Sequence, residues 1–324
     1  MTASTTTQIC SFLSLLLLCQ SSAVDLNEHP TLKYGTLYSG TGGAMTEESK
    51  LVTADLVHKA IQSGFRHIDT ACQPRHYNEA GVGDGWTKAA RELNLRREDI
   101  WIQTKYTAIN AHDPISRPYP GDAMHEDRVR ASLQHSLEML QTNYIDSLLM
   151  HAPEAEWDDH WKVWRTMESA VDEGKVHQLG ISNFYKLEDL QRVYEHARIK
   201  PRVLQNSFHG KSGHDVGIRA FCKEHDIEYQ SFFTLSSNLE AFRHLDAVEL
   251  AHAKGLTPEE LFFAFCMAIG ISPLVGTTNG VYMEDDMHLM NRIRSGEQMF
   301  ADTKELAIIG NALGSAGWMT VDEF

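Results

Sequence analysis

The chain has 324 residues, with 29 lysines and arginines against 44 aspartates and glutamates, a net charge of −15 and 42% hydrophobic residues. This acidic balance argues against a nucleic-acid binder and against docking on anionic lipid, which both depend on Lys and Arg. The length permits two domains or one α/β barrel. Five cysteines do not make a disulfide framework in so long a chain, and no Cys-x-x-Cys pair indicates a metal site.

Residues 1–23 are a predicted signal peptide. They contain no Lys, Arg, Asp or Glu, and the apolar run Ile9–Cys19 is too short to span a bilayer. Ser21, Ser22 and Ala23 supply the small side chains that a signal peptidase accepts. The sequence therefore predicts the secretory pathway, meaning secretion, the endoplasmic reticulum lumen or a plastid reached by that route. The alternative is a cytoplasmic protein. No stable membrane insertion is expected after cleavage.

From about residue 32, short apolar runs alternate with helical patterns, as expected for a parallel sheet. The predicted strands are Leu32–Gly35, Arg66–Ala71, Ile100–Tyr106, Ile145–His151, Val176–Ser182, Val203–Phe208, Glu228–Phe233 and Ile271–Gly276. Between them, apolar residues recur at helical spacing, for example at Val129, Leu133, Leu137 and Leu140. No Gly-x-Gly-x-x-Gly follows a strand. We therefore expect a single (β/α)8 TIM barrel over residues 24–310 and a tail at residues 311–324.

Titratable residues gather at the predicted C-terminal ends of the strands, where barrels place their chemistry. Asp69, Lys105 and His151 lie near the ends of the second, third and fourth strands, and Tyr77 lies in the loop after Asp69. Each alone has an ordinary explanation as a cap, a solvated charge or a packed side chain. Together they suit carbonyl reduction. Tyr77 would donate a proton, Lys105 would lower the Tyr77 pKa, Asp69 would hold Lys105, and His151 would bind the substrate oxygen.

Six stretches, in this order and spacing, resemble the aldo-keto reductases. They are Gly64–Ala71 (GFRHIDTA), Tyr77–Glu79 (YNE), Gln103–Lys105 (QTK), Tyr144–Pro153 (YIDSLLMHAP), Leu179–Phe184 (LGISNF) and Val203–Asn206 (VLQN). The resemblance covers almost all of residues 32–290 and implies an NAD(P)H-dependent reductase on a (β/α)8 barrel.

The resemblance also implies roles for single residues. Asp69, Tyr77, Lys105 and His151 fall on the catalytic tetrad of the family, where Asp69 also counts toward the cofactor site. Ser182, Asn183 and Gln205 fall on the residues that hold the nicotinamide carboxamide.

The chain departs from the usual family pattern at three places. The spacing from Asp69 to Tyr77 is three residues longer, which, like the long connection 107–124, resembles a subgroup found in fungi, plants and algae. Phe232 stands where most members place the Tyr that stacks under the nicotinamide. The cationic grip on the 2′-phosphate of NADP is replaced by Gly276, Thr277 and Thr278. We therefore expect NADP or NAD, with NADPH slightly favoured by the resemblance.

The predicted partner is a small carbonyl substrate, and the predicted state is a monomer. We expect the strand-end loops and the connection 107–124, with His112 and Tyr119, to line the pocket. Asp285 and Asp286 would lie near the adenosine, or would be ordinary acidic residues in the first turn of a helix. Two other functions stay open, which are a nucleotide-binding barrel without turnover and a barrel enzyme without redox chemistry.

Overall fold

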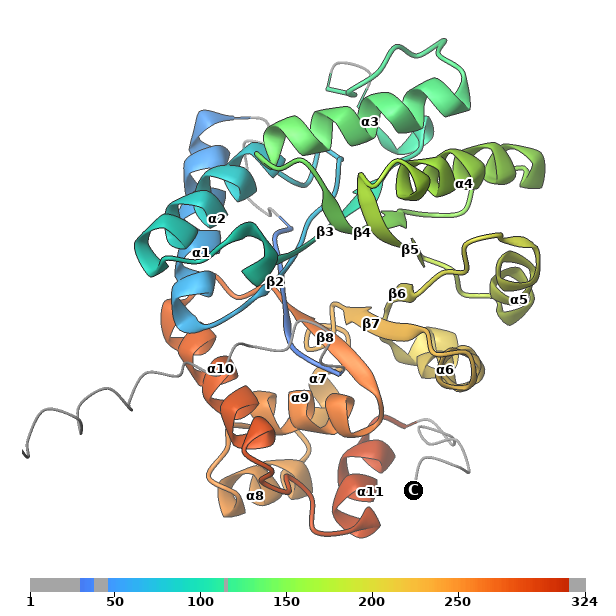
Figure 1. The fold of residues 1–324 in the computed structure, drawn as a ribbon. Coiled ribbons are helices and arrows are strands. Elements are labelled where there is room, and N and C mark those ends of the chain that lie inside the picture. The colour runs from blue at the N-terminus through green and yellow to red at the C-terminus, as the bar shows by residue number, and fades with distance from the viewer. Residues whose placement is uncertain (1–29, 38–45, 114–115, 315–324) are drawn as a thin grey trace, which may run out of the picture.

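The computed structural model describes residues 30–37, 46–113 and 116–314 (Figure 1). The predicted signal peptide and residues 315–324 of the predicted tail lie outside the described residues. Eight parallel strands pair in chain order and close into a barrel, since β1 pairs with both β2 and β8. The predicted single (β/α)8 barrel is confirmed.

Each strand lies within the range predicted from the sequence. The strands are β1 Lys33–Gly35, β2 His67–Asp69, β3 Trp101–Tyr106, β4 Ile145–Met150, β5 Val176–Ser182, β6 Val203–Ser207, β7 Glu228–Phe232 and β8 Ile271–Val275. The observed strands are mostly shorter at their C-terminal ends, where the chain turns toward the next helix. As a result Asp69 is the last residue of β2, and His151 follows the last residue of β4.

Helices cover the outside of the barrel (Figure 1). They are α1 Glu47–Ser63, α2 Glu79–Leu93, α3 His125–Met139, α4 Trp157–Asp172, α5 Leu187–His196, α6 Val216–Glu224, α7 Leu239–Phe242, α8 Leu245–Ala253, α9 Pro258–Ala268, α10 Gly280–Arg294 and α11 Thr303–Ala312. Three 3-10 helices span Arg97–Asp99, Ile109–Ala111 and Gly210–Asp215. Because α11 reaches residue 312, the predicted start of the tail at residue 311 falls inside a helix. Among the residues described, no helix has the length and apolar character needed to cross a membrane.

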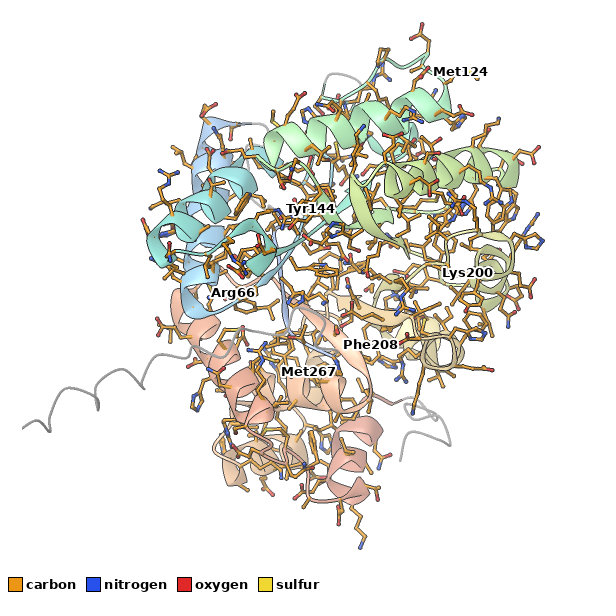
Figure 2. The ribbon with its side chains drawn as sticks, viewed as in Figure 1. Arg66, Met124, Tyr144, Lys200, Phe208 and Met267 are labelled. Atoms are coloured by element: carbon orange, nitrogen blue, oxygen red, sulfur yellow. The ribbon has the colours of Figure 1, made fainter. Side chains whose placement is uncertain are left out.

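The core lies between the strands and the helices that cover them. Figure 2 shows Phe208 and Met267 inside the molecule and Met124 at its edge, in agreement with exposed fractions of 0%, 6% and 62%. The predicted apolar face of α3 is buried as expected, with Val129 among its buried residues. Cys72, Cys222 and Cys266 are buried free thiols.

Helix α2 packs unusually closely against its neighbours through three glycines. A Cβ atom on Gly81 or Gly85 would lie 2.6 Å from a backbone oxygen of α1. A Cβ atom on Gly83 would overlap the backbone oxygen of Met139, at the end of α3. Side chains cannot fit at these three positions, so α2 is held tightly between α1 and α3. This packing fixes the N-terminus of α2, which begins at Glu79, two residues after Tyr77.

Candidate active site

The four predicted catalytic residues meet at the C-terminal mouth of the barrel. Asp69 and Lys105 extend from β2 and β3, and His151 follows β4. The centroid of the Tyr77 ring lies 6.1 Å from that of His151 and 5.5 Å from the Lys105 Nζ atom. The longer segment before Tyr77 forms a turn in which the Tyr77 N–H donates to the Gln73 carbonyl at 3.0 Å. This turn absorbs the additional residues and brings Tyr77 to the other three.

Lys105 and Asp69 form a buried ion pair. The Nζ atom donates to Asp69 Oδ2 at 2.7 Å and to the Thr70 carbonyl at 2.8 Å, and Lys105 is 1% exposed. Burial lowers the pKa of the Lys105 ammonium, while the Asp69 charge and hydrogen bond oppose that change. The pair therefore places the Lys105 ammonium and the Asp69 carboxylate side by side, out of contact with water.

Asp69 is also the end of a polar network through the barrel interior. Its Oδ1 atom accepts from the side-chain amides of Gln103 at 2.7 Å and Gln205 at 3.0 Å. Both amides also donate to Gln230 Oε1, and Gln230 donates to Glu228 at 2.9 Å. No functional role is predicted from the sequence for Gln103, Gln230 or Glu228. The alternation of side chains along a strand could have indicated these residues. Gln103 lies on the same face of β3 as Lys105, and Glu228 and Gln230 lie on one face of β7.

His151 is neutral at physiological pH. Burial, followed by the Lys105 charge, lowers its pKa to about 3. Its Nδ1 atom lies 2.7 Å from Thr107 Oγ1. When the Thr107 hydroxyl donates in this bond, the His151 proton lies on Nε2, the nitrogen left to donate to a substrate. The sequence analysis did not identify Thr107 as the partner of His151.

The predicted effect of Lys105 on Tyr77 is wrong. The pKa of the Tyr77 phenol is raised above its usual value, first by burial and second by the Asp69 carboxylate. The Lys105 ammonium does not reverse this shift because it donates to Asp69 and the Thr70 carbonyl. Tyr77 therefore holds its proton at neutral pH.

The three predicted carboxamide-binding residues lie together beside His151. The Ser182 hydroxyl donates to the Gln205 carbonyl at 2.8 Å, and Asn183 Nδ2 donates to the His151 carbonyl at 2.8 Å. Asn183 has a φ of 61°, the left-handed conformation that Asn tolerates better than most residues. All three line the same pocket as Tyr77.

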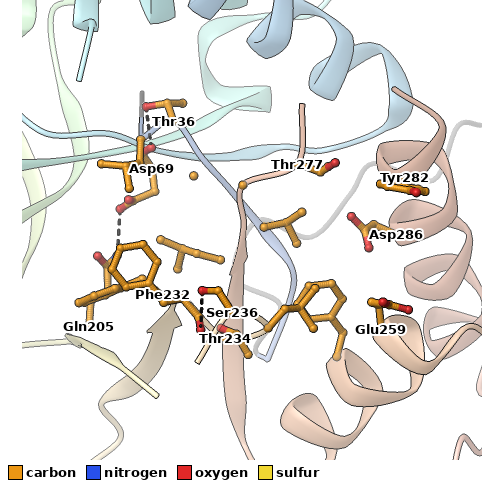
Figure 3. Close-up of a pocket in the computed structure, with 18 of the residues that line it drawn as sticks. Thr36, Asp69, Gln205, Phe232, Thr234, Ser236, Glu259, Thr277, Tyr282 and Asp286 are labelled. Atoms are coloured by element: carbon orange, nitrogen blue, oxygen red, sulfur yellow. Dashed lines mark hydrogen bonds between the residues drawn. The ribbon is translucent and has the colours of Figure 1, made fainter. Parts of the chain in front are cut away.

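This pocket, of about 850 Å³, extends from the tetrad to α10. Figure 3 shows Asp69, Gln205 and Phe232 at one side and Tyr282 and Asp286 at the other. Of the remaining residues predicted for the cofactor, Gly276 and Thr277 line the pocket, and Thr278 is not among the lining residues.

The described residues of the connection 107–124 do not line the pocket, so that expectation is wrong. Tyr119 and His112 are both buried. The Tyr119 hydroxyl donates to the Thr107 carbonyl at 2.7 Å, and the His112 ring lies 3.1 Å from the same carbonyl. The connection therefore packs back onto the end of β3.

The end of the pocket far from the tetrad is acidic. It is lined by two carboxylates of α9 and two of α10, which are Glu259, Glu260, Asp285 and Asp286. Figure 3 shows Glu259 and Asp286. Among the described residues that line the pocket there is no Lys or Arg. Burial, with the charges of Glu260 and Asp285, raises the pKa of Asp286 to about 7. The alternative that Asp285 and Asp286 belong to the first turn of a helix is wrong, since α10 begins at Gly280.

Comparisons with known proteins agree with this architecture. The chain is 29% identical over 250 residues to a 9,11-endoperoxide prostaglandin H2 reductase of Trypanosoma cruzi, covering 76% of this chain and 80% of that protein. It is 30% identical over 216 residues to a methylglyoxal reductase of Salmonella typhimurium, covering 66% and 70%.

Among solved structures, an aldo-keto reductase of the silkworm Bombyx mori complexed with NADPH matches with a TM-score of 0.68 and 22% identity. That match covers 90% of this chain and 86% of the silkworm protein. The model of the aldo/keto reductase family matches residues 31–308 of this chain. With the closed barrel and these relatives, that match shows that the chain belongs to the aldo/keto reductase family.

Proposed function

We propose that this protein reduces an aldehyde or ketone to an alcohol, with NADH or NADPH as the reductant and Tyr77 as the proton donor. The observation that carries the proposal is that Asp69, Tyr77 and His151 line one large pocket, with Asp69 in a buried ion pair with Lys105. When bound, the reduced nicotinamide supplies a hydride to the carbonyl carbon.

The protein's own residues stabilise and then neutralise the negative charge that develops on the carbonyl oxygen. His151 is neutral, and with the Thr107 hydroxyl donating to its Nδ1 atom, its Nε2–H donates a hydrogen bond to that oxygen. The Tyr77 hydroxyl transfers its proton to the same oxygen, so that hydride and proton together convert C=O into CH–OH. The Lys105 Nζ atom lies 5.5 Å from the centroid of the ring that carries the remaining tyrosinate. Tyr77 then recovers a proton from water.

The pocket fits a nicotinamide dinucleotide. Its volume suits a large ligand, and amide and hydroxyl groups lie next to the tetrad. The residues we assign to the cofactor are Asp69, Ser182, Asn183, Gln205, Phe232, Gly276 and Thr277, and the predicted Thr278 is left out because it does not line the pocket. In this assignment Ser182, Asn183 and Gln205 hold the carboxamide and the Phe232 ring stacks on the nicotinamide. The NADPH bound in the silkworm structure supports the same cofactor class here.

We further propose that NADH is preferred over NADPH. With the nicotinamide held at the tetrad, the other end of the dinucleotide would be held at the end lined by the four carboxylates. A ribose 2′-hydroxyl can donate to a carboxylate, whereas a 2′-phosphate there meets like charge and no Lys or Arg of the described lining. We expect NADH to bind at least about tenfold more tightly than NADPH, a difference of about 1.4 kcal/mol.

Asp285→Arg tests this preference. Asp285 is half-buried on the pocket wall, and its replacement supplies a guanidinium for the 2′-phosphate. We expect it to tighten NADPH binding relative to NADH in fluorescence titrations. Glu284→Arg, an exposed neighbour on the same helix that does not line the pocket, is the matched control. Tighter binding of NADPH by the unaltered protein would contradict the preference.

The reaction itself is tested by titrating the purified chain with both cofactors and following oxidation of the tighter binder with an activated aromatic aldehyde. Cofactor binding with turnover supports the reductase. Binding without turnover would identify a nucleotide-binding barrel, and absence of binding would leave a barrel enzyme without redox chemistry.

We propose that residues 1–23 carry the protein into the secretory pathway. We also propose that the active form is a monomer, because one chain supplies every residue of the pocket described above. Light scattering of the purified protein tests the second statement, and a dimer mass at micromolar concentration contradicts it.

A further inference from the structure

Three metal-ligating side chains meet outside the active-site pocket. Cys72 lies in the turn after β2, Glu79 is the first residue of α2, and His135 lies on α3. One ligand atom from each, a sulfur, a carboxylate oxygen and an imidazole nitrogen, lies within 4.8 Å of the other two. Cys72 and Glu79 are 1% and 5% exposed, and His135 is partly exposed.

The buried Glu79 carboxylate is held only by neutral donors. Its Oε1 atom accepts from the Thr104 hydroxyl at 2.6 Å, and its Oε2 atom accepts from the Ser136 hydroxyl at 3.0 Å. Within the described ranges, no Lys or Arg forms a salt bridge with Glu79. The Lys105 charge acts on Glu79 from a distance, but its ammonium donates to Asp69 and not to Glu79. A carboxylate removed from water without a directly bound cation is costly, so this site favours a positive ion.

We propose that Cys72, Glu79 and His135 bind one zinc ion. Thiolate, carboxylate and imidazole are the ligands that zinc takes in proteins. The thiolate and the carboxylate together carry two negative charges, which balance Zn²⁺ and leave the buried site neutral. On binding, the Cys72 thiol loses its proton to water and a zinc–sulfur bond forms. A water molecule completes the tetrahedron from the partly exposed side, beside His135.

The spacing of the ligands is close to what zinc requires. Zinc–ligand bonds of 2.0–2.3 Å place tetrahedral ligand atoms roughly 3.5 Å apart. The observed limit of 4.8 Å therefore needs shifts of about 1 Å, which side-chain rotations of Glu79 and His135 provide.

The site is adjacent to the catalytic residues without sharing any of them. The Cys72 N–H donates to the Lys105 carbonyl at 3.1 Å, and Glu79 accepts from Thr104, the neighbour of Lys105. Tyr77 lies on the segment between Cys72 and Glu79. A zinc ion would join this segment to α3 through His135, so its role is to brace the turn that carries Tyr77.

The experiment uses the purified full chain after chelation and dialysis. Zinc content by elemental analysis is expected to return to one ion per chain after zinc is added. Cobalt(II) is the spectroscopic probe, because a cobalt–thiolate bond gives an ultraviolet charge-transfer band that histidine and carboxylate ligands do not. The chain has 17 histidines, so weak surface binding is expected in every variant, without this band.

Cys72→Ser should abolish the band, while Cys222→Ser, an equally buried thiol far along the chain on α6, should retain it. His135→Gln, at a partly exposed position that tolerates the change, should weaken zinc binding at least about tenfold and reduce the rise in melting temperature on zinc addition. These readouts do not depend on turnover, so the proposed reductase activity is judged separately. A missing band in the unaltered chain, or the same band in Cys72→Ser, would overturn the site and leave adventitious binding only.

Discussion

Lys105 is a cation held almost completely out of water, and its charge is stable only because Asp69 accompanies it. The carboxylate accepts from Lys105 on one oxygen and from Gln103 and Gln205 on the other, so both of its oxygens are hydrogen-bonded. Breaking such a pair from one side leaves an uncompensated buried charge. The active site therefore depends on Asp69 for stability as well as for chemistry.

Asp69→Asn should lower the free energy of unfolding by about 3 kcal/mol, since the amide cannot balance the Lys105 ammonium. Urea denaturation at pH 7 measures this. Asp172→Asn breaks the exposed pair with Arg198, whose side chains are 57% and 53% exposed, and should cost less than about 1 kcal/mol. Equal losses of unfolding free energy in the two variants would show that the buried pair stabilises the protein no more than the exposed pair does.

Tyr77→Phe should lower kcat by about 10²- to 10⁴-fold and leave the cofactor Kd almost unchanged. The ring stays against His151, but the proton donor is gone. Stopped-flow turnover and fluorescence titration separate the two quantities. Tyr194→Phe, on α5, controls for loss of a hydroxyl elsewhere and should keep full turnover. An unchanged rate in Tyr77→Phe would assign the proton to another group.

The positions of these side chains could be predicted, and their energetics could not. Parallel strands end at one rim, so Asp69, Lys105 and His151 were expected together from the strand pattern. The pKa of Tyr77 depends on how deeply the phenol is buried and on which acceptor takes the Lys105 protons. Both are properties of the folded structure.

Helix α4 carries a histidine whose ring nitrogens form no hydrogen bond within the described structure. His160 is 1% exposed, and among the described residues neither ring nitrogen has a hydrogen-bond partner. The rings of Trp157 and Trp161 lie 4.9 and 5.1 Å from it. Burial lowers the pKa of His160 to about 4, so the imidazole is folded in its neutral form.

Acid should therefore destabilise the protein through His160. Between pH 6.5 and about 4 the unfolded chain binds a proton at this position and the native chain does not, so stability falls as the pH falls. The loss reaches about 3 kcal/mol at pH 4. In urea denaturation at several pH values, His160→Phe should remove this part of the pH dependence. The exposed His252→Gln should retain it, and an unchanged profile in His160→Phe would contradict the assignment.

The close packing of helix α2 gives a second prediction about the helices. Gly83→Ala places a methyl group on the Met139 carbonyl and should cost about 3 kcal/mol or prevent folding. Gly217→Ala, in α6, meets only Leu187 Cδ2 at 3.8 Å and should be neutral or stabilising by up to about 1 kcal/mol. Thermal and urea unfolding compare the two, and equal stability would mean that α2 moves aside freely.

All eight strands could be predicted because each is a short apolar run followed by a helical pattern. The pocket wall could not be predicted in the same way. The connection 107–124 was expected over the pocket, but Tyr119 and His112 both contact the Thr107 carbonyl, a tertiary contact that composition does not encode. Likewise, the tail was expected to start at residue 311, but helix α11 continues to Ala312. Asp302 caps this helix at its N-terminus.

For the molecule as a whole, the proposed signal peptide and the barrel are separate parts of the chain. Residues 1–23 contain none of the charged residues, so a protein cleaved there keeps the full charge of −15. A C-terminal fluorescent fusion should be found in the secretory pathway, and deletion of residues 2–23 should move it to the cytosol. A diffuse cytosolic signal from the full chain would refute the targeting proposal.

The buried thiols of Cys72, Cys222 and Cys266 bear on where such a protein can work. Because none of them is paired with another, the barrel needs no oxidant or disulfide exchange to reach its fold. The same polypeptide is therefore compatible with the reducing cytosol and with the oxidising lumen. If residues 1–23 are a signal peptide as proposed, a change there alone would move the protein between compartments without any change to the barrel.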